Sequence, residues 1–274
     1  RTLDGENGFS MGAFRASARG ALDGGVSYFV QTSFTGTPAL LDARITHRAS
    51  PGFGVSVGAM KAPFSAEFLT GAADIDFVNR SRGVSALAPG RQLGLMLDGR
   101  LGGSPVHYQA GVFNGNGVRA NGNDGGVMGA GRLEVRTAGV RAGVSGAVSE
   151  DRSVSVGPFS SFNGTRTLFG ADVRATHGAW TGSAEVIGAE LDPDGGMAEK
   201  PWGFHVTGAL ATSPRVQILA RLDALKADDI WTRYGVAGLN FWPTGPTELQ
   251  FNVLVPLGES TEEPQLLVNA QINL

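Results

Sequence analysis

Cysteine is absent from this 274-residue sequence, and charged residues of either sign are scarce. Without cysteine the chain has no disulfide bridges and no thiolate metal sites. Charged residues make up 17 % of the chain, less than the usual quarter, and lysine occurs only at Lys61, Lys200 and Lys226. No apolar run approaches the ~18–20 residues of a membrane-spanning helix, and residues 1–6 do not have the pattern of a signal peptide. Helical membrane proteins and disulfide-stapled domains are therefore excluded.

Glycine is abundant, with 42 residues, and hydrophobic residues make up 42 % of the chain. Because glycine costs roughly 1 kcal/mol per helix position relative to alanine, this composition disfavours a helical protein. Apolar and polar residues alternate instead, as where Phe53, Val55 and Val57 oppose Gly54 and Ser56. Period two over segments of about ten residues is typical of a half-buried strand, and we count about fifteen such segments.

Short and long connections alternate between these segments. The short ones carry glycine, proline or serine and are predicted near 23–25, 50–51, 103–105, 137–138, 177–178, 213–214 and 244–246. The long ones are predicted at 62–90, 114–126, 149–164, 190–201, 223–231 and 256–263. This order predicts an antiparallel up-and-down meander in a single domain, residues 1–274, with all the long loops at one end.

The length and number of the strands favour a membrane barrel over a soluble one. Segments of ~9–11 residues match a tilted crossing of a bilayer. About fifteen strands enclose more volume than side chains can fill, so the interior holds water and the apolar faces point into lipid. Aromatic residues near strand ends, among them Trp180, Trp202, Trp231 and Trp242, fit interfacial girdles. We predict an all-β transmembrane antiparallel up-and-down β-barrel of about 15–16 strands, with a soluble β architecture as the alternative.

The connection at 62–90 is much longer than its neighbours and carries Phe64, Phe68 and Phe77. A long segment of this kind is usually functional or disordered, and this one is too apolar for a solvated tail, so it must pack against something. The motifs in and around it are K-A-P-F-S-A-E at 61–67, D-F-V-N-R-S at 76–81, L-A-P-G-R-Q-L-G at 87–94 and G-V-F-N-G at 111–115. With Gly8-Phe9 and the segment Arg15–Gly20, they resemble the phosphate-selective porin O and P family over roughly residues 8–116.

This resemblance implies a sixteen-stranded barrel in the bacterial outer membrane, usually a homotrimer, with loop 62–90 folded inward as the constriction. Our count of strands falls one short of that number. The charged residues expected at the constriction are Lys61, Glu67, Arg80, Arg82 and Arg91. For Glu67 and Arg80 the alternative is a salt bridge that pins the loop to the wall.

Arginine dominates the polar faces of the predicted strands. The expected lumen-wall residues are Arg44, Arg48, Arg100, Arg132, Arg136, Arg141, Arg174, Arg215 and Arg221, and the same pattern includes Arg15, Arg19, Arg166 and Arg233. Because arginine is always charged and binds oxyanions, such a wall favours anions. The alternatives are a dedicated phosphate channel and a wall in which the arginines only brace facing carboxylates.

Together these features predict a passive porin for small hydrophilic, mainly anionic solutes, in contact with outer-membrane lipid. We expect no cofactor, no nucleic-acid partner and no enzyme activity. The alternative is a structural or anchoring subunit of a larger envelope complex, with a plugged lumen. Gly54-Val-Ser56-Val-Gly58 matches a hydrolase elbow only in form, because it lies within a strand. The four histidines lack metal spacing and Asp192-Pro-Asp194-Gly lacks the full calcium-loop pattern, so no metal site is expected.

Overall fold

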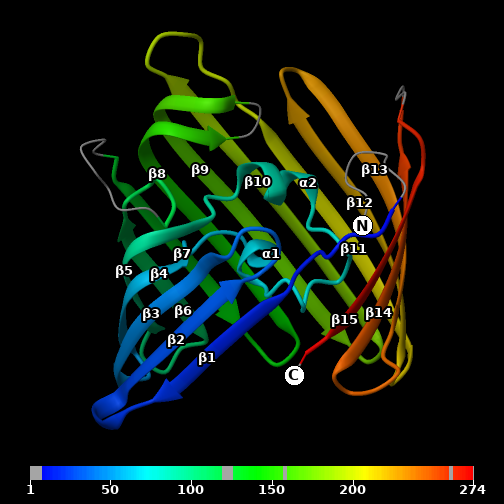
Figure 1. Cartoon of the computed structure of the whole chain (residues 1–274), viewed down its shortest axis with the longest axis horizontal. Coiled ribbons are helices and arrows are strands. Elements are labelled where there is room, and N and C mark those ends of the chain that lie inside the picture. Colours follow the sequence, from blue (N-terminus) through cyan, green and yellow to red (C-terminus); the bar gives the residue numbers. More distant parts are fainter. Residues whose placement is uncertain (1–7, 119–125, 157–158, 259–261, 274) are drawn as a thin grey trace.

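The computed structural model describes residues 8–118, 126–156, 159–258 and 262–273, and within these ranges the chain is almost entirely β-strand (Figure 1). The first strands are β1 (Arg15–Ala21), β2 (Val26–Ser33), β3 (Ala39–Ser50), β4 (Phe53–Lys61), β5 (Arg91–Arg100), β6 (Val106–Phe113) and β7 (Met128–Arg136). The others are β8 (Val140–Val156), β9 (Phe159–His177), β10 (Trp180–Pro193), β11 (Trp202–Ser213), β12 (Val216–Ala227), β13 (Ile230–Phe241), β14 (Thr247–Pro256) and β15 (Gln265–Ile272). The short helices α1 (Ala66–Leu69) and α2 (Arg82–Leu87) lie between β4 and β5, and a 3-10 turn, η1 (Asp23–Gly25), joins β1 to β2. In the described ranges no helix has the length and apolarity needed to cross a membrane.

The fifteen strands form one antiparallel sheet in which each strand pairs with its neighbours in sequence order. The sheet curls around an interior that the segment between β4 and β5 enters (Figure 1). This arrangement confirms the predicted all-β, up-and-down barrel. β1 and β15 are the two ends of the sheet, and no pairing joins them within the described ranges.

The polarity of the two faces of the sheet is opposite to that of a soluble barrel, because the outer face is apolar and the inner face is polar. Val57, Val144 and Leu266 are each more than half exposed on the outer face. Asp42, Arg132 and other polar side chains on the inner face are buried. Hydrocarbon is a favourable surrounding for the first set, whereas the second set needs water or hydrogen-bond partners inside. The alternation in the sequence therefore places apolar residues toward lipid, as expected.

Two connections are shorter than the sequence predicted. The segment 149–164 continues the pairing of β8 with β9, from Ser149 opposite Arg166 to Val156 opposite Phe159. The segment 223–231 lies mostly in β12 and β13, which a turn of Asp228 and Asp229 connects. Both predictions of long loops were wrong, because polar side chains on extended strands gave the same sequence signal as a loop.

Other predicted features lie partly outside the described residues. These are the N-terminal residues 1–7, positions 119–125 of the loop at 114–126, positions 157–158 of the loop at 149–164, positions 259–261 of the loop at 256–263, and Leu274. The predicted short turns, in contrast, all fall within the described ranges and join consecutive strands at one end of the sheet.

Candidate functional site

Residues 62–90, which we call the lumen loop, leave the wall after β4 and return to it at β5 (Figure 1). Both helices in the lumen loop begin at a serine. The Oγ of Ser65 accepts a hydrogen bond from Phe68 N at 3.0 Å, and the Oγ of Ser81 accepts one from Val84 N at 3.4 Å. Serine at this position satisfies a free N–H of the first turn. The loop therefore has local structure that its own sequence specifies.

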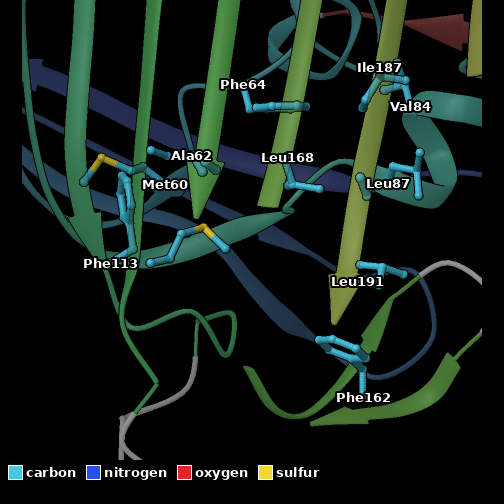
Figure 2. Packing of buried hydrophobic residues seen from close by; sticks show 14 of the residues in the cluster. Met60, Ala62, Phe64, Val84, Leu87, Phe113, Phe162, Leu168, Ile187 and Leu191 are labelled. Atoms are coloured by element: carbon cyan, nitrogen blue, oxygen red, sulfur yellow. The ribbon is translucent and has the colours of Figure 1, made fainter. Parts of the chain in front are cut away.

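The apolar side of the lumen loop packs on the inner wall of the barrel. Phe64, Val84 and Leu87 are at most 1 % exposed and belong to one buried cluster with Leu168 of β9 and Ile187 of β10 (Figure 2). Complete burial of a side chain of this size contributes about 1.5–3 kcal/mol. An apolar patch on this part of the inner wall is the physical reason that a loop with this composition folds inward.

Gly83 of α2 allows the closest approach between the loop and the wall. A Cβ at this position would lie 3.2 Å from the Cα of Gly203 in β11 and 3.0 Å from Cγ2 of Ile187. A Cβ on Gly203 would likewise lie 3.0 Å from the Cα of Gly83. The backbone of α2 is thus in direct contact with the backbone of β11, and this close approach requires glycine at both positions.

Glu67 is the central polar anchor of the loop. Its Oε1 accepts a hydrogen bond from Nη2 of Arg221 at 2.6 Å, and its Oε2 accepts one from Ser81 N at 2.8 Å. Burial acts to raise the pKa of Glu67, but Arg221, His205 and the contacts with Ser81 outweigh it and hold the pKa below its usual value. The side chain is therefore an ionised carboxylate in a buried ion pair at neutral pH.

A row of wall side chains holds the backbone of the lumen loop by hydrogen bonds. Asp223 accepts from Arg82 N at 3.0 Å, and Asn252 accepts from Val78 N at 2.8 Å. Further contacts join Ser65 N to Ser145 Oγ, Glu67 N to Glu185 Oε2, Arg221 Nη1 to Asn79 O, Asn240 Nδ2 to Asp76 O, Gln250 Nε2 to Ile75 O and Gln271 Nε2 to Ala73 O. Because these partners extend from β8 to β15, the loop crosses the interior and is attached to the opposite wall.

Lys61 and Arg80, both predicted at the constriction, bind the end of α1. Lys61 Nζ donates to the carbonyl oxygens of Phe68 at 2.6 Å and Thr70 at 2.8 Å. Arg80 donates through Nη2 to the same Thr70 oxygen at 2.7 Å and through Nε to the backbone oxygen of Glu67 at 3.1 Å. Cations at a helix C-terminus satisfy free carbonyls and favour its dipole. The alternative of a salt bridge that pins the loop to the wall is confirmed for Glu67, whose wall partner is Arg221, whereas Arg80 contacts backbone oxygens of the loop instead.

Arg82 begins α2 and contacts β13, whereas Arg91 begins β5 and contacts β3. Arg91 donates through Nε to Asp42 Oδ2 at 3.0 Å, whereas the guanidinium of Arg82 lies 3.9 Å from the ring centre of Tyr234 and 3.7 Å from Glu262. Burial lowers the pKa of Arg80, Glu67 opposes this shift, and the charges of Arg15 and Arg91 add to it. Arg15 of β1, which alternation assigned only to the lumen wall, and Arg91 are therefore close enough to Arg80 for their charges to act on it.

Several of the predicted wall arginines make ion pairs. The pairs are Arg48 with Asp98, Arg132 with Asp172 and Glu134, Arg136 with Glu134, Arg174 with Asp76 of the loop, and Arg221 with Glu67. Arg44 instead lies 5.5 Å from the ring centre of Phe29, and Arg100 and Arg141 make no ion pair within the described ranges. Arg215 lies in the short turn between β11 and β12.

One predicted lumen arginine faces the other way. Arg233 of β13 is exposed, while its neighbour Tyr234 is buried in the inner cluster with Phe77 and Val236. The prediction of Arg233 in the lumen was therefore wrong. Trp231, which was expected at the membrane interface, has the same parity in β13 and therefore lies on the same outer face as Arg233.

Charge is distributed unevenly around the inner wall. The inward positions of β1–β6 hold five arginines, Arg15, Arg19, Arg44, Arg48 and Arg100, against two aspartates, Asp42 and Asp98. At the inward positions of β7–β15 the charges are balanced, with six arginines and six carboxylates. These are Arg132, Arg136, Arg141, Arg166, Arg174 and Arg221 against Glu134, Asp151, Asp172, Glu185, Asp223 and Glu248. The lumen loop is attached to the balanced side, so the cationic side lies opposite its bonded face.

The amide side chains that hold the loop were not predicted from the sequence. Asn240, Gln250, Asn252 and Gln271 all point inward and three of them are at most 2 % exposed. The signal that could have identified them is a set of uncharged amide side chains at inward positions of β13, β14 and β15. Buried amides of this kind need hydrogen-bond partners, and a segment inside the barrel can supply them.

The motifs that were discounted in the sequence are structural. Ser56 lies within β4, and its Oγ is 2.8 Å from Oγ1 of Thr46. In the described ranges no three His, Asp or Glu side chains are grouped so as to hold a metal ion. Neither feature adds chemistry to the lumen loop and its surroundings.

Comparison with known proteins identifies similar chains. A family model described as phosphate-selective porin O and P matches residues 1–157. No curated protein matches the sequence. An anion-selective porin from Comamonas acidovorans has a similar structure, with a TM-score of 0.71 at 14 % identity, over 96 % of this chain and 86 % of that one.

Two further solved structures show the same architecture. OmpT of Vibrio cholerae in a trimer form has a TM-score of 0.70 at 13 % identity, over 98 % of this chain and 91 % of that one. OmpF of Salmonella typhi has a TM-score of 0.66 at 9 % identity, over 93 % of this chain and 87 % of that one. At such identities the likeness concerns the fold alone.

Proposed function

This chain belongs to the phosphate-selective porin O and P family and is a porin of the bacterial outer membrane, and from that premise we propose that it passes small hydrophilic solutes by diffusion with a preference for anions. It acts as a channel and not as an enzyme. The lumen loop, residues 62–90, forms the constriction, and Arg15, Arg80 and Arg91 line its cationic side.

The observation that carries this proposal is the excess of arginine on the inner face of β1–β6. The lumen loop is attached to the opposite wall from β8 to β15, so its other side faces the cationic strands. A solute that passes between them meets guanidinium groups at Arg19, Arg44 and Arg100 that no carboxylate neutralises in the described ranges. Rows of unneutralised arginine attract anions and repel cations.

Lys61 and Arg82 have lesser roles in this proposal. Three carbonyl oxygens surround Lys61 Nζ, so this ammonium group stabilises the loop. Arg82 is held over Tyr234. Glu67 fixes the position of the loop through Arg221 and is not itself exposed to solute. At the narrow point we place Arg15 with Arg80, which also binds carbonyl oxygens of α1, and Arg91, which is paired with Asp42.

The second candidate function is a structural or anchoring barrel with a plugged lumen, as part of a larger envelope complex. The observation that favours it is the number of wall strands that bind the loop, which reaches as far as β15 through Gln271. A loop that is attached to strands from β8 to β15 blocks more of the lumen than a loop that contacts only the wall next to β4 and β5.

Single-channel recording in planar bilayers separates the two candidates. The proposed porin gives discrete conductance steps, and in a KCl gradient its reversal potential indicates that chloride is more permeant than potassium. A folded protein that never conducts refutes the porin and favours the anchoring role. Conductance with potassium as the more permeant ion refutes the anion preference alone.

We also propose that the chain assembles as a homotrimer. The solved structure of Vibrio cholerae OmpT in a trimer form covers 98 % of this chain and supplies the precedent. Mass measurement of the detergent-solubilised protein tests this assembly, and a monomer as the sole species contradicts it.

A further inference from the structure

The outer surface of β11–β13 carries an aromatic cluster with one arginine. Trp202 and Phe204 of β11 and Trp231 of β13 lie with ring centres 5.0–6.3 Å apart. The guanidinium carbon of Arg233 lies 5.0 Å from the ring centre of Trp231. These residues are near the ends of their strands where the longer loops lie. In barrels of this kind the longer loops are extracellular, so the cluster lies at the level of the outer headgroups.

Arg233 is the exception on this surface, because its charge has no partner. Its guanidinium makes no ion pair and no hydrogen bond with any residue in the described ranges. Lys226, the other outward cation here, is paired with Asp229 at 2.7 Å. An unpaired cation facing a membrane is unfavourable unless an anion or water solvates it.

The surface on the membrane side of Arg233 is apolar. The next row of outward residues across the strands contains Val206, Leu222 and Val255, which are between 41 % and 50 % exposed. Gly235 lies between Leu222 and Val255 in this row. Acyl chains fit such a surface. The charged headgroup of the same lipid, at the membrane surface, then lies at the level of Arg233.

We propose that Arg233, fixed by its contact with Trp231, binds the phosphate of a phosphorylated lipid of the outer leaflet. Guanidinium groups bind phosphate oxygens in two-pronged geometry, and this one has no protein oxygen to compete in the described ranges. The ring of Trp231 holds the guanidinium in place from the side, and the apolar row below receives the acyl chains. The lipid acts from outside the barrel, so the site is independent of solute passage.

The test compares lipid retention by the purified full-length protein. Mixed micelles contain either lipid A, which carries phosphate, or lipid A from which phosphate has been removed, and bound lipid is counted by native mass spectrometry. The wild-type protein is expected to retain the phosphorylated form preferentially. Arg233→Gln lowers that preference about five-fold, as expected for one basic residue at a membrane surface.

Three further variants make the result decisive. Arg215→Gln removes one exposed charge at the opposite end of the barrel and retains the preference. Arg233→Lys retains charge but loses the planar fork and gives an intermediate preference. Trp231→Leu frees the guanidinium and also gives an intermediate value. The single-channel conductance of Arg233→Gln is expected to equal that of the wild type.

The proposal is overturned if the wild type retains both lipid forms equally, or if Arg215→Gln lowers the preference as much as Arg233→Gln. It is also overturned if Arg233→Gln changes the oligomeric state without changing lipid retention, because the surface then contacts a second copy of the chain. If Arg233→Gln does not fold, the comparison of wild type with Arg233→Lys decides.

Discussion

Nη2 of Arg221 and Oε1 of Glu67 lie 2.6 Å apart, although 154 positions separate these residues in the chain. Their side chains are 4 % and 9 % exposed. Arg221 also donates to Asn79 O at 3.3 Å and lies 4.2 Å from the ring centre of Phe77. One wall arginine thus holds both halves of the lumen loop, so it acts as a brace and not as a contact for solute.

Replacing Glu67 tests this brace. Glu67→Gln leaves Arg221 buried without its carboxylate, which costs roughly 3–5 kcal/mol for a buried pair. The loop is expected to detach part of the time, so single-channel recordings show a larger mean conductance and more open-channel noise. Arg221→Gln is expected to have the same effect. Because the two residues act as a pair, the double variant is expected to be less affected than the sum of the single ones.

The attachment of the loop also depends on pH. The pKa of Glu67 in the attached loop lies below its ordinary value of 4.5. A lowered pKa stabilises the attached state above the ordinary value, and this stabilisation is lost as pH falls through the lowered pKa. The contribution of Glu67 to conductance noise is therefore expected to appear as a rise below about pH 4.5. Glu67→Gln is expected to lack the part of the rise that Glu67 causes, and an identical pH profile in both proteins contradicts this assignment.

Gly83 provides a test of how α2 is seated. Gly83→Val places side-chain atoms against Gly203 and Ile187, and overpacking of this kind typically costs 1–3 kcal/mol. We expect faster cleavage of the loop by protease in the folded barrel. Ser85→Val is the matched control, because Ser85 is the exposed residue of α2. Equal cleavage rates in the two variants are incompatible with a close contact at Gly83.

The arginines on the first strands are expected to set ion preference. Arg19→Gln with Arg44→Gln removes two charges that no carboxylate balances in the described ranges, so the reversal potential in a KCl gradient is expected to shift toward potassium permeability. Arg152→Gln with Arg215→Gln removes the same charge from exposed positions outside the constriction and leaves the reversal potential unchanged. A shift of equal size in both double variants indicates an effect of net charge and contradicts a role for the wall.

The sequence by itself determined the architecture of the protein. Alternation over segments such as 53–61 identifies strands, and glycine- and proline-rich turns identify their antiparallel order. These are local properties, because the side-chain direction in a strand depends only on parity. The same rule failed at Arg233 and in 149–164, where polar residues continue on extended strands or lie at the membrane interface.

The contacts of the lumen loop were decided by the tertiary structure. Pairing of Glu67 with Arg221, of Asp76 with Arg174 and of Gly83 with Gly203 depends on where a curved sheet brings distant strands together. No period in the sequence encodes these distances. Whether an inward arginine braces a carboxylate or remains free for a solute depends on its neighbours across the lumen, which is why Arg132 and Arg44, alike in the sequence, have different environments.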